Sequence, residues 1–133
     1  MNGEPSFDTN IGEGQDGNFP TVIDSSHKYT DVLSDRYIGP GNAHHNYLIQ
    51  RKDGKRFLYV RFQDGPIKEA GVNGVMDENL LAIVIDRLVG FQSGPYACEE
   101  NSLALSYIKQ GLDALKDRTA KREARGVEGT HTK

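Results

Sequence analysis

Three arginines near the C-terminus have the spacing that places side chains on one face of a helix. Arg118, Arg122 and Arg125 stand at i, i+4 and i+7, and side chains so spaced are neighbours on a helix surface. Gly126 is expected to end this helix, because glycine is favoured just past a helix C-terminus. Residues 126–130 then form a tight loop in which two glycines could present backbone N–H groups and a threonine its hydroxyl. Aligned guanidinium groups next to such a loop make a candidate anion receptor.

A solvated helix end is the alternative for the same residues. The helix dipole favours cations near a C-terminus, and charged runs on helices are usually exposed faces. The opposite end of the helix offers no substitute site, since Glu99 and Glu100 fall in the expected first turn and would repel phosphate there. An anion would therefore bind along the helix flank or at its far end.

The bend before the long helix contains groups that could recognise a nucleoside. Phe91 and Tyr96 could stack on a purine, although packing at a helix corner is the simpler role for both. Asn101 could contact a base or ribose edge, or help to cap the helix. Catalysis has less support, because His44 and His45 lack partners at metal-ligand spacing and no nucleophile–base arrangement is visible. We therefore predict recognition without turnover, with no catalytic residue, metal or cofactor.

Two helices must position these residues. The segment 97–125 carries apolar residues at helical spacing in its first half. This stripe consists of Leu103, Tyr107, Ile108, Gly111, Leu112, Leu115 and Thr119. The segment 77–90 is apolar almost all round, with Asp77 as its expected N-cap and Gly90 as its end. A strand over residues 81–85 is the rival interpretation, but the length of the segment favours a helix buried on several sides, including against another subunit.

A small antiparallel sheet is expected before these helices, over residues 46–75. Residues 47–51 and 56–63 have strand character and flank an Asp-Gly turn. Residues 67–70 are expected to add a third strand, and residues 27–46 to be irregular. The predicted fold class is therefore α+β, a small antiparallel sheet followed by an antiparallel helical hairpin.

Composition limits the class of partner. A chain of 133 residues suits one domain, with residues 1–26 as a flexible acidic arm and residues 27–133 as the ligand-binding domain. The net charge of −3 disfavours duplex nucleic acid, yet residues 116–133 carry six basic and three acidic side chains, so we expect a small anionic partner there. Cys98 alone permits no intrachain disulfide, no secretory signal is visible, and the apolar run 80–85 is too short to span a bilayer. A cytosolic protein without a membrane partner is expected.

Three runs in the C-terminal half carry a family resemblance. They read IVIDRLVGFQ, ACEEN and RTAKREARGVEGTH, at residues 83–92, 97–101 and 118–131. With them, the chain resembles the helical-hairpin domain of phage nucleotide sponges, which are the anti-Thoeris proteins of the first class and the related anti-CBASS proteins. Residues 61–75 fit the small sheet of the anti-Thoeris branch, and the resemblance covers residues 56–131.

The resemblance implies a binding function. In such sponges, a cyclic ADP-ribose isomer made from NAD by a host TIR-domain enzyme is bound without being cleaved. By resemblance, Phe91 stacks on adenine and Asn101 supplies an amide contact. Arg118 and Arg122 are implied to bind the phosphates. A second site, for the cyclic oligonucleotides of CBASS defence, is also implied. Its matching residues are Arg125, Gly126, Val127, Glu128, Gly129, Thr130 and His131. Family members form dimers and hexamers, which implies a homo-oligomer in the cytoplasm of the infected bacterial host.

Affinity arithmetic also favours assembly. A sponge needs nanomolar affinity, about −12 kcal/mol. Two or three charge-assisted contacts at about 1.5–3 kcal/mol each, with one stacked base at about 1–3 kcal/mol, reach that value only in a preformed pocket that excludes water. One helix flank cannot enclose a ligand, so we expect pockets between protomers. Two other functions stay open: a hydrolase that degrades cyclic nucleotide signals, and a small structural or interaction protein without a nucleotide ligand.

Overall fold

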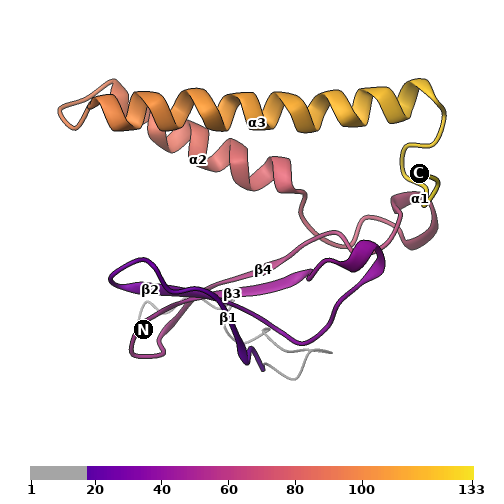
Figure 1. The fold of residues 1–133 in the computed structure, drawn as a ribbon, viewed down its shortest axis with the longest axis horizontal. Helices are drawn as coiled ribbons and strands as arrows, with labels where there is room; N and C mark the ends of the chain where they lie inside the picture. Colours follow the sequence, from indigo (N-terminus) through magenta and orange to yellow (C-terminus); the bar gives the residue numbers. More distant parts are fainter. Residues whose placement is uncertain (1–17) are drawn as a thin grey trace, which may run out of the picture. The chain divides into compact units, whose positions relative to one another are not determined.

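The computed structural model describes residues 18–133, and the chain divides into two compact units (Figure 1). One unit ends at Gly65 and contains the β-sheet, while the other, Pro66–Lys133, contains three helices. Most of the expected acidic arm falls on residues 1–17, which lie outside the described residues. Within residues 18–133, no helix is both long enough and apolar enough to cross a membrane.

The β-sheet has four antiparallel strands in the order β1-β2-β3-β4 (Figure 1). They are β1 (Thr21–Asp24), β2 (Thr30–Ser34), β3 (Asn46–Arg51) and β4 (Arg56–Arg61). The predicted fold class is confirmed, but the sheet begins at Thr21 rather than near residue 46. The expectation that residues 27–46 are irregular was wrong, because β2 lies there. β1 is exposed along its whole length and so lacks the alternation of a half-buried strand.

The core of the sheet unit is a cluster of Phe19, Leu33 and Leu48. Leu48 lies opposite Leu33 of β2 and opposite Tyr59 of β4, so these side chains share one face of the sheet. Phe19 meets the Tyr59 ring edge-on, with ring centroids 5.9 Å apart. Burial raises the pKa of the Tyr59 hydroxyl. The cluster shows why Phe19 is fixed although it precedes the first strand.

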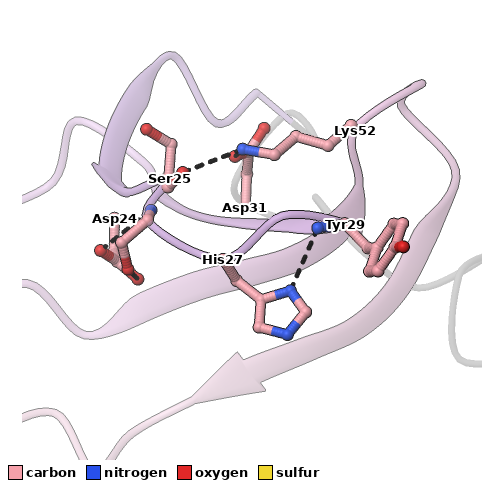
Figure 2. A network of polar contacts seen from close by, with 7 residues as sticks. Asp24, Ser25, His27, Tyr29, Asp31 and Lys52 are labelled. Atoms are coloured by element: carbon pink, nitrogen blue, oxygen red, sulfur yellow. Dashed lines mark hydrogen bonds and ion pairs between the residues drawn. The ribbon is translucent and has the colours of Figure 1, made fainter.

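Lys52, in the turn between β3 and β4, binds residues in and next to the turn between β1 and β2. Its ammonium group lies 2.6 Å from the Asp31 carboxylate and donates to the Ser25 carbonyl oxygen at 3.0 Å. Figure 2 shows these contacts beside His27, whose Nδ1 accepts the Tyr29 backbone N–H at 3.1 Å. The polar groups around this turn are therefore hydrogen-bonded within the sheet unit.

The hairpin between β3 and β4 turns at the predicted Asp-Gly pair. Gly54 has a φ of +98°, a conformation that favours glycine. Asp53 accepts two hydrogen bonds from the Arg51 guanidinium, at 2.8 and 2.6 Å, and one from the Lys55 backbone N–H at 3.2 Å. The Arg51 guanidinium, with the backbone N–H groups, lowers the pKa of the Asp53 carboxyl to about 2.

The second unit begins with a short helix where a strand was predicted. α1 (Ile67–Ala70) is a single turn, in which Gly71 N–H donates to the Ile67 carbonyl oxygen at 2.9 Å. Gly71 ends it with a φ of +75°. The strand prediction for residues 67–70 was wrong because four residues are too few for periodicity to separate the two structures.

The helical hairpin consists of α2 (Asp77–Gln92) and α3 (Glu99–Ala124). Asp77 is the first helical residue of α2 rather than its N-cap; Met76 is the N-cap, and its backbone N–H donates to the Asn79 side chain at 2.8 Å. α2 also continues past Gly90, the predicted end, because a glycine inside a helix weakens it without breaking it.

No residue of α2 or α3 is fully buried. Several apolar side chains of the hairpin are largely exposed, including Ile83 at 63%, Leu103 at 57% and Tyr107 at 64%. Leu103, Tyr107 and Gly111 were placed on the packing stripe by their spacing but are exposed. The half-buried stripe of α3 keeps four predicted residues, Ile108, Leu112, Leu115 and Thr119, and adds Asn101, Ala104, Leu105 and Arg122. One chain therefore leaves these apolar side chains of the hairpin exposed.

Candidate functional site: the helical hairpin and its C-terminal loop

The bend between α2 and α3 is fixed by one side chain. Gln92 donates to the Cys98 carbonyl oxygen at 3.1 Å and accepts the Cys98 backbone N–H at 3.0 Å. Ser93 also donates to the Gly90 carbonyl oxygen at 2.8 Å. Because both polar groups of the Gln92 amide are used, the start of α3 is held at a set position relative to the end of α2.

Phe91 lies in the last turn of α2, next to this bend, with one other ring and one cation beside it. Tyr96 stands 6.5 Å away between centroids, at an interplanar angle of 78°, and is itself 74% exposed. The Arg87 guanidinium lies 5.0 Å from the Phe91 ring centroid, a cation–π distance. Arg87 was not among the predicted site residues, because the helix was expected to end at Gly90. With α2 running to Gln92, Arg87 and Phe91 stand four positions apart on one helix and so are neighbours. A base that stacks on Phe91 would use the other face or share the ring with Arg87.

Asn101 lies near this bend, whereas the arginines lie at the far end of α3. Seventeen positions separate Asn101 from Arg118, which at about 1.5 Å per residue is about 25 Å along the helix axis. Asn101 is half-buried, whereas Arg118 is exposed. Within one chain, Asn101 therefore lies at the bend end of α3, and Arg118 and Arg122 lie toward its other end.

Arg122 is engaged within its own chain. Its guanidinium donates to the carbonyl oxygens of Val127 and Thr130, each at 3.0 Å. Arg125 donates to the carbonyl oxygen of Lys133. The three aligned arginines thus differ: Arg122 and Arg125 bind residues that follow the helix, whereas Arg118 is exposed and makes no such contact.

The helix ends at the predicted place. Arg125 is the C-cap of α3, and Gly126 follows with a φ of +74°. The Gly126 N–H donates to the Glu123 carbonyl oxygen and the Val127 N–H to that of Arg122, each at 3.0 Å. This pair of bonds is the Schellman arrangement that satisfies the last carbonyl groups of a helix. Gly126 is therefore needed to end the helix in this conformation.

Residues 126–131, called the C-terminal loop below, fold back on themselves. Thr130 donates its hydroxyl to the Val127 carbonyl oxygen at 2.6 Å and its backbone N–H to the same oxygen at 3.1 Å. Within residues 18–133, the N–H groups of Glu128, Gly129 and His131 have no hydrogen-bond acceptor. These three amides, rather than the Thr130 hydroxyl, are the groups that the loop has available for an anion.

The C-terminal loop rests on α1, a contact that the sequence did not predict. The Lys68 backbone N–H donates to the Gly129 carbonyl oxygen at 2.8 Å, and His131 Nδ1 lies 2.6 Å from the Glu69 carboxylate. Lys68 and Glu69 were missed because residues 67–70 were assigned to a strand. Among residues 18–133, no group of His, Cys, Asp and Glu side chains could hold a metal ion.

Comparisons with known proteins agree with the geometry of the hairpin. Residues 54–120 match the model of the family described as Acb2/Tad1, hairpin domain. The chain is also similar to a protein named Thoeris anti-defense 1, from Bacillus phage SBSphiJ7. The two are 44% identical over 102 residues, which cover 76% of this chain and 72% of that relative. The family match includes β4, α2 with Phe91, the bend after it, and α3 as far as residue 120. On this evidence the chain belongs to the Acb2/Tad1 hairpin-domain family.

Proposed function

We propose that this protein is a phage anti-defence sponge that binds and sequesters cyclic ADP-ribose-type signals of Thoeris immunity without cleaving them. Membership of the Acb2/Tad1 hairpin-domain family carries the proposal, with support from the relative named Thoeris anti-defense 1. The protein acts by binding rather than by catalysis. The proposed place of action is the cytoplasm of the infected bacterial host, where the signal is made.

The proposed ligand contacts come from both ends of the hairpin. Phe91 stacks on adenine and Asn101 contacts the nucleoside, while Arg118 and Arg122 neutralise the phosphates. Because about 25 Å of helix separates Asn101 from Arg118, a small ligand cannot reach both groups in one chain. We therefore propose that each pocket takes its aromatic end from one protomer and its arginines from another.

A homo-oligomer follows from the same proposal. The hairpin has no fully buried residue and leaves Ile83, Leu103 and Tyr107 more than half exposed. Exposed apolar patches of this kind are typical of protein–protein interfaces. A dimer would complete the pockets, and a hexamer would cover more of the apolar surface.

A second ligand class is proposed for the C-terminal loop. Arg125 and the N–H groups of Glu128, Gly129 and His131 offer one charge and several amides to a cyclic oligonucleotide of CBASS defence. Backbone amides in turns are common phosphate ligands. This site would lie beyond the helix end and would be distinct from the cyclic ADP-ribose pocket.

The test is mass spectrometry of what the protein releases. Purified protein is exposed to lysate from cells with an activated Thoeris system, washed, and heat-denatured. Release of an intact cyclic ADP-ribose isomer, in an amount proportional to the amount of protein, supports sequestration. Release of a linear product would identify a hydrolase, and release of no nucleotide would favour a structural or interaction protein.

A further inference from the structure

α1 holds the C-terminal loop through two neighbouring residues. Lys68 binds the loop by its backbone, through the hydrogen bond of 2.8 Å to Gly129. It also packs closely there, since a Cβ added to Gly129 would lie 3.0 Å from Lys68 Cγ. Glu69 binds the loop by its side chain, with its carboxylate at a hydrogen-bond distance of 2.6 Å from His131 Nδ1. The loop and α1 thus meet by a backbone hydrogen bond, a close packing contact and a side-chain hydrogen bond, which is an ion pair when the imidazole is protonated.

Arg122 holds the same loop from α3. Its two hydrogen bonds go to the carbonyl oxygens of Val127 and Thr130, while the Gly129 carbonyl oxygen is taken by Lys68. Three carbonyl groups of the chain from Val127 to Thr130 are therefore directed to donors in α3 and α1. With those carbonyl groups bound, the free N–H groups of the loop become the ones left for a ligand.

We propose that Glu69 is a positioning residue for the C-terminal loop: through His131 it keeps the loop docked on α1, and the docked loop is the form that binds an anionic ligand. The ligand part of this inference rests on the proposed function, whereas the docking part does not. Glu69 itself touches no ligand in this scheme. Its effect on binding passes through the conformation of the loop.

Because Glu69 is negatively charged, the proposal can be tested by whether its replacement raises or lowers the affinity for an anionic ligand. A carboxylate close to a phosphate site repels the ligand, so removal of that charge alone would tighten anion binding. Loss of the docked conformation would weaken it instead. A role in positioning and a role as a mere surface charge therefore predict opposite changes in affinity when Glu69 is replaced.

The docking part is tested without ligand, by hydrogen exchange of the Lys68 amide in the full-length protein. The informative variant is His131→Ala, because His131 is remote in sequence from Lys68 and leaves the intrinsic exchange of that amide unchanged. The pair is exposed, at 77% and 52%. We expect Lys68 exchange to rise about two- to fivefold, the scale of an exposed ion pair. Asp117→Asn is the control, since it removes an ion pair of 3.2 Å with Lys121, within α3.

Two further variants show whether Glu69 and His131 act together. Glu69→Ala, corrected for its intrinsic effect on the neighbouring amide, should raise Lys68 exchange as His131→Ala does, and the double variant should add nothing further. Glu69→Gln, which keeps a hydrogen-bond acceptor for the imidazole, should have a smaller effect. Unchanged Lys68 exchange in both His131→Ala and Glu69→Ala would overturn the docking role.

The ligand part is tested by calorimetric titration with cyclic trinucleotides of adenosine and of guanosine. Glu69→Ala should weaken the binding of whichever probe binds by about two- to fivefold, in step with the loss of docking. Unchanged or tighter binding would overturn the positioning role. If the wild-type protein binds neither probe while Lys68 exchange still rises in the variants, the proposed second ligand and the ligand part of this inference fail together, and the docking role stands.

Discussion

Arg122 donates a hydrogen bond to the carbonyl oxygen of Thr130 at 3.0 Å and so ties the last helix to the end of the chain. Arg118, one helical turn earlier, is exposed and has no hydrogen bond or ion pair within residues 18–133. The two arginines proposed to bind the same phosphates therefore differ in the hydrogen bonds that they make in the free protein. Arg118 has its guanidinium free for a ligand, while Arg122 must share its donors between the loop and a ligand.

Replacement of the two arginines should separate these roles. Arg118→Ala should weaken binding of the cyclic ADP-ribose isomer about 10- to 150-fold, the value of one charge-assisted contact, and should leave the thermal unfolding of the free protein unchanged. Arg122→Ala should weaken binding and also lower the stability of the free protein, because it removes the two hydrogen bonds that join the Arg122 guanidinium to the Val127 and Thr130 carbonyl oxygens. Calorimetric titration and thermal unfolding measure the two effects. Equal stability of both variants would contradict the assigned difference.

Phe91→Ala should remove the stacked base. The expected loss is about 5- to 150-fold in affinity, since stacking on an aromatic side chain is worth about 1–3 kcal/mol. Phe91→Tyr keeps the ring and should bind within about threefold of the wild-type protein. Phe57→Ala, which removes another aromatic side chain, 41% exposed on β4, serves as the control. Full affinity of Phe91→Ala would exclude the stacking role.

Gly129→Ala should destabilise the C-terminal loop by more than the cost of placing an alanine at a positive φ. Gly129 has a φ of +78°, which costs an L-residue about 1–2 kcal/mol, and the new Cβ would also press on the Lys68 side chain at 3.0 Å. Gly41→Ala is a matched control, because Gly41 has a φ of +80° and nothing within 4 Å of an added Cβ.

The same variant addresses the two-site proposal. Gly129→Ala should lose binding of cyclic trinucleotides and keep binding of the cyclic ADP-ribose isomer, as measured by titration with each ligand. Loss of both ligands together would mean that the C-terminal loop and the hairpin pocket are a single site.

Asp53 should give the sheet unit a pH dependence in the acidic range. Its pKa is lowered from 3.8 to about 2 by the Arg51 guanidinium and the Lys55 N–H. A carboxyl group whose pKa is depressed by folding stabilises the fold above its unfolded pKa, and this stabilisation is lost as the pH falls toward the folded value. Asp53→Asn should therefore reduce the urea midpoint near pH 5 and have little effect near pH 2. A difference between variant and wild type that is the same at both pH values would contradict the lowered pKa.

The helical hairpin could be predicted because its pattern is long and its stop signals are strong. The apolar segment before Gly90 exceeds the length of a strand, and Gly126 ends the last helix in the expected αL conformation. The predicted end of α2 at Gly90 was wrong by two residues, because glycine is compatible with either the end or the interior of a helix.

β3 and β4 were predicted together with their Asp-Gly turn, but β1, β2 and the docking contacts could not be predicted in the same way. β1 is exposed throughout, so no periodicity marks it, and its place in the sheet depends on its pairing with β2. Likewise, the ion pair of Glu69 with His131 joins residues 62 positions apart. Spacing along a chain carries no information about such a contact until the fold brings the two residues together.

The length of helix between the bend and the arginines has a genetic consequence. If a pocket takes Phe91 from one subunit and Arg118 from its neighbour, a chain with only Phe91→Ala and a chain with only Arg118→Ala each have every pocket weakened when expressed alone. In a mixed dimer, one of the two pockets receives both damaged groups, while the other receives both intact ones. Co-expression of two defective genes would thus restore protection to the phage, by intragenic complementation.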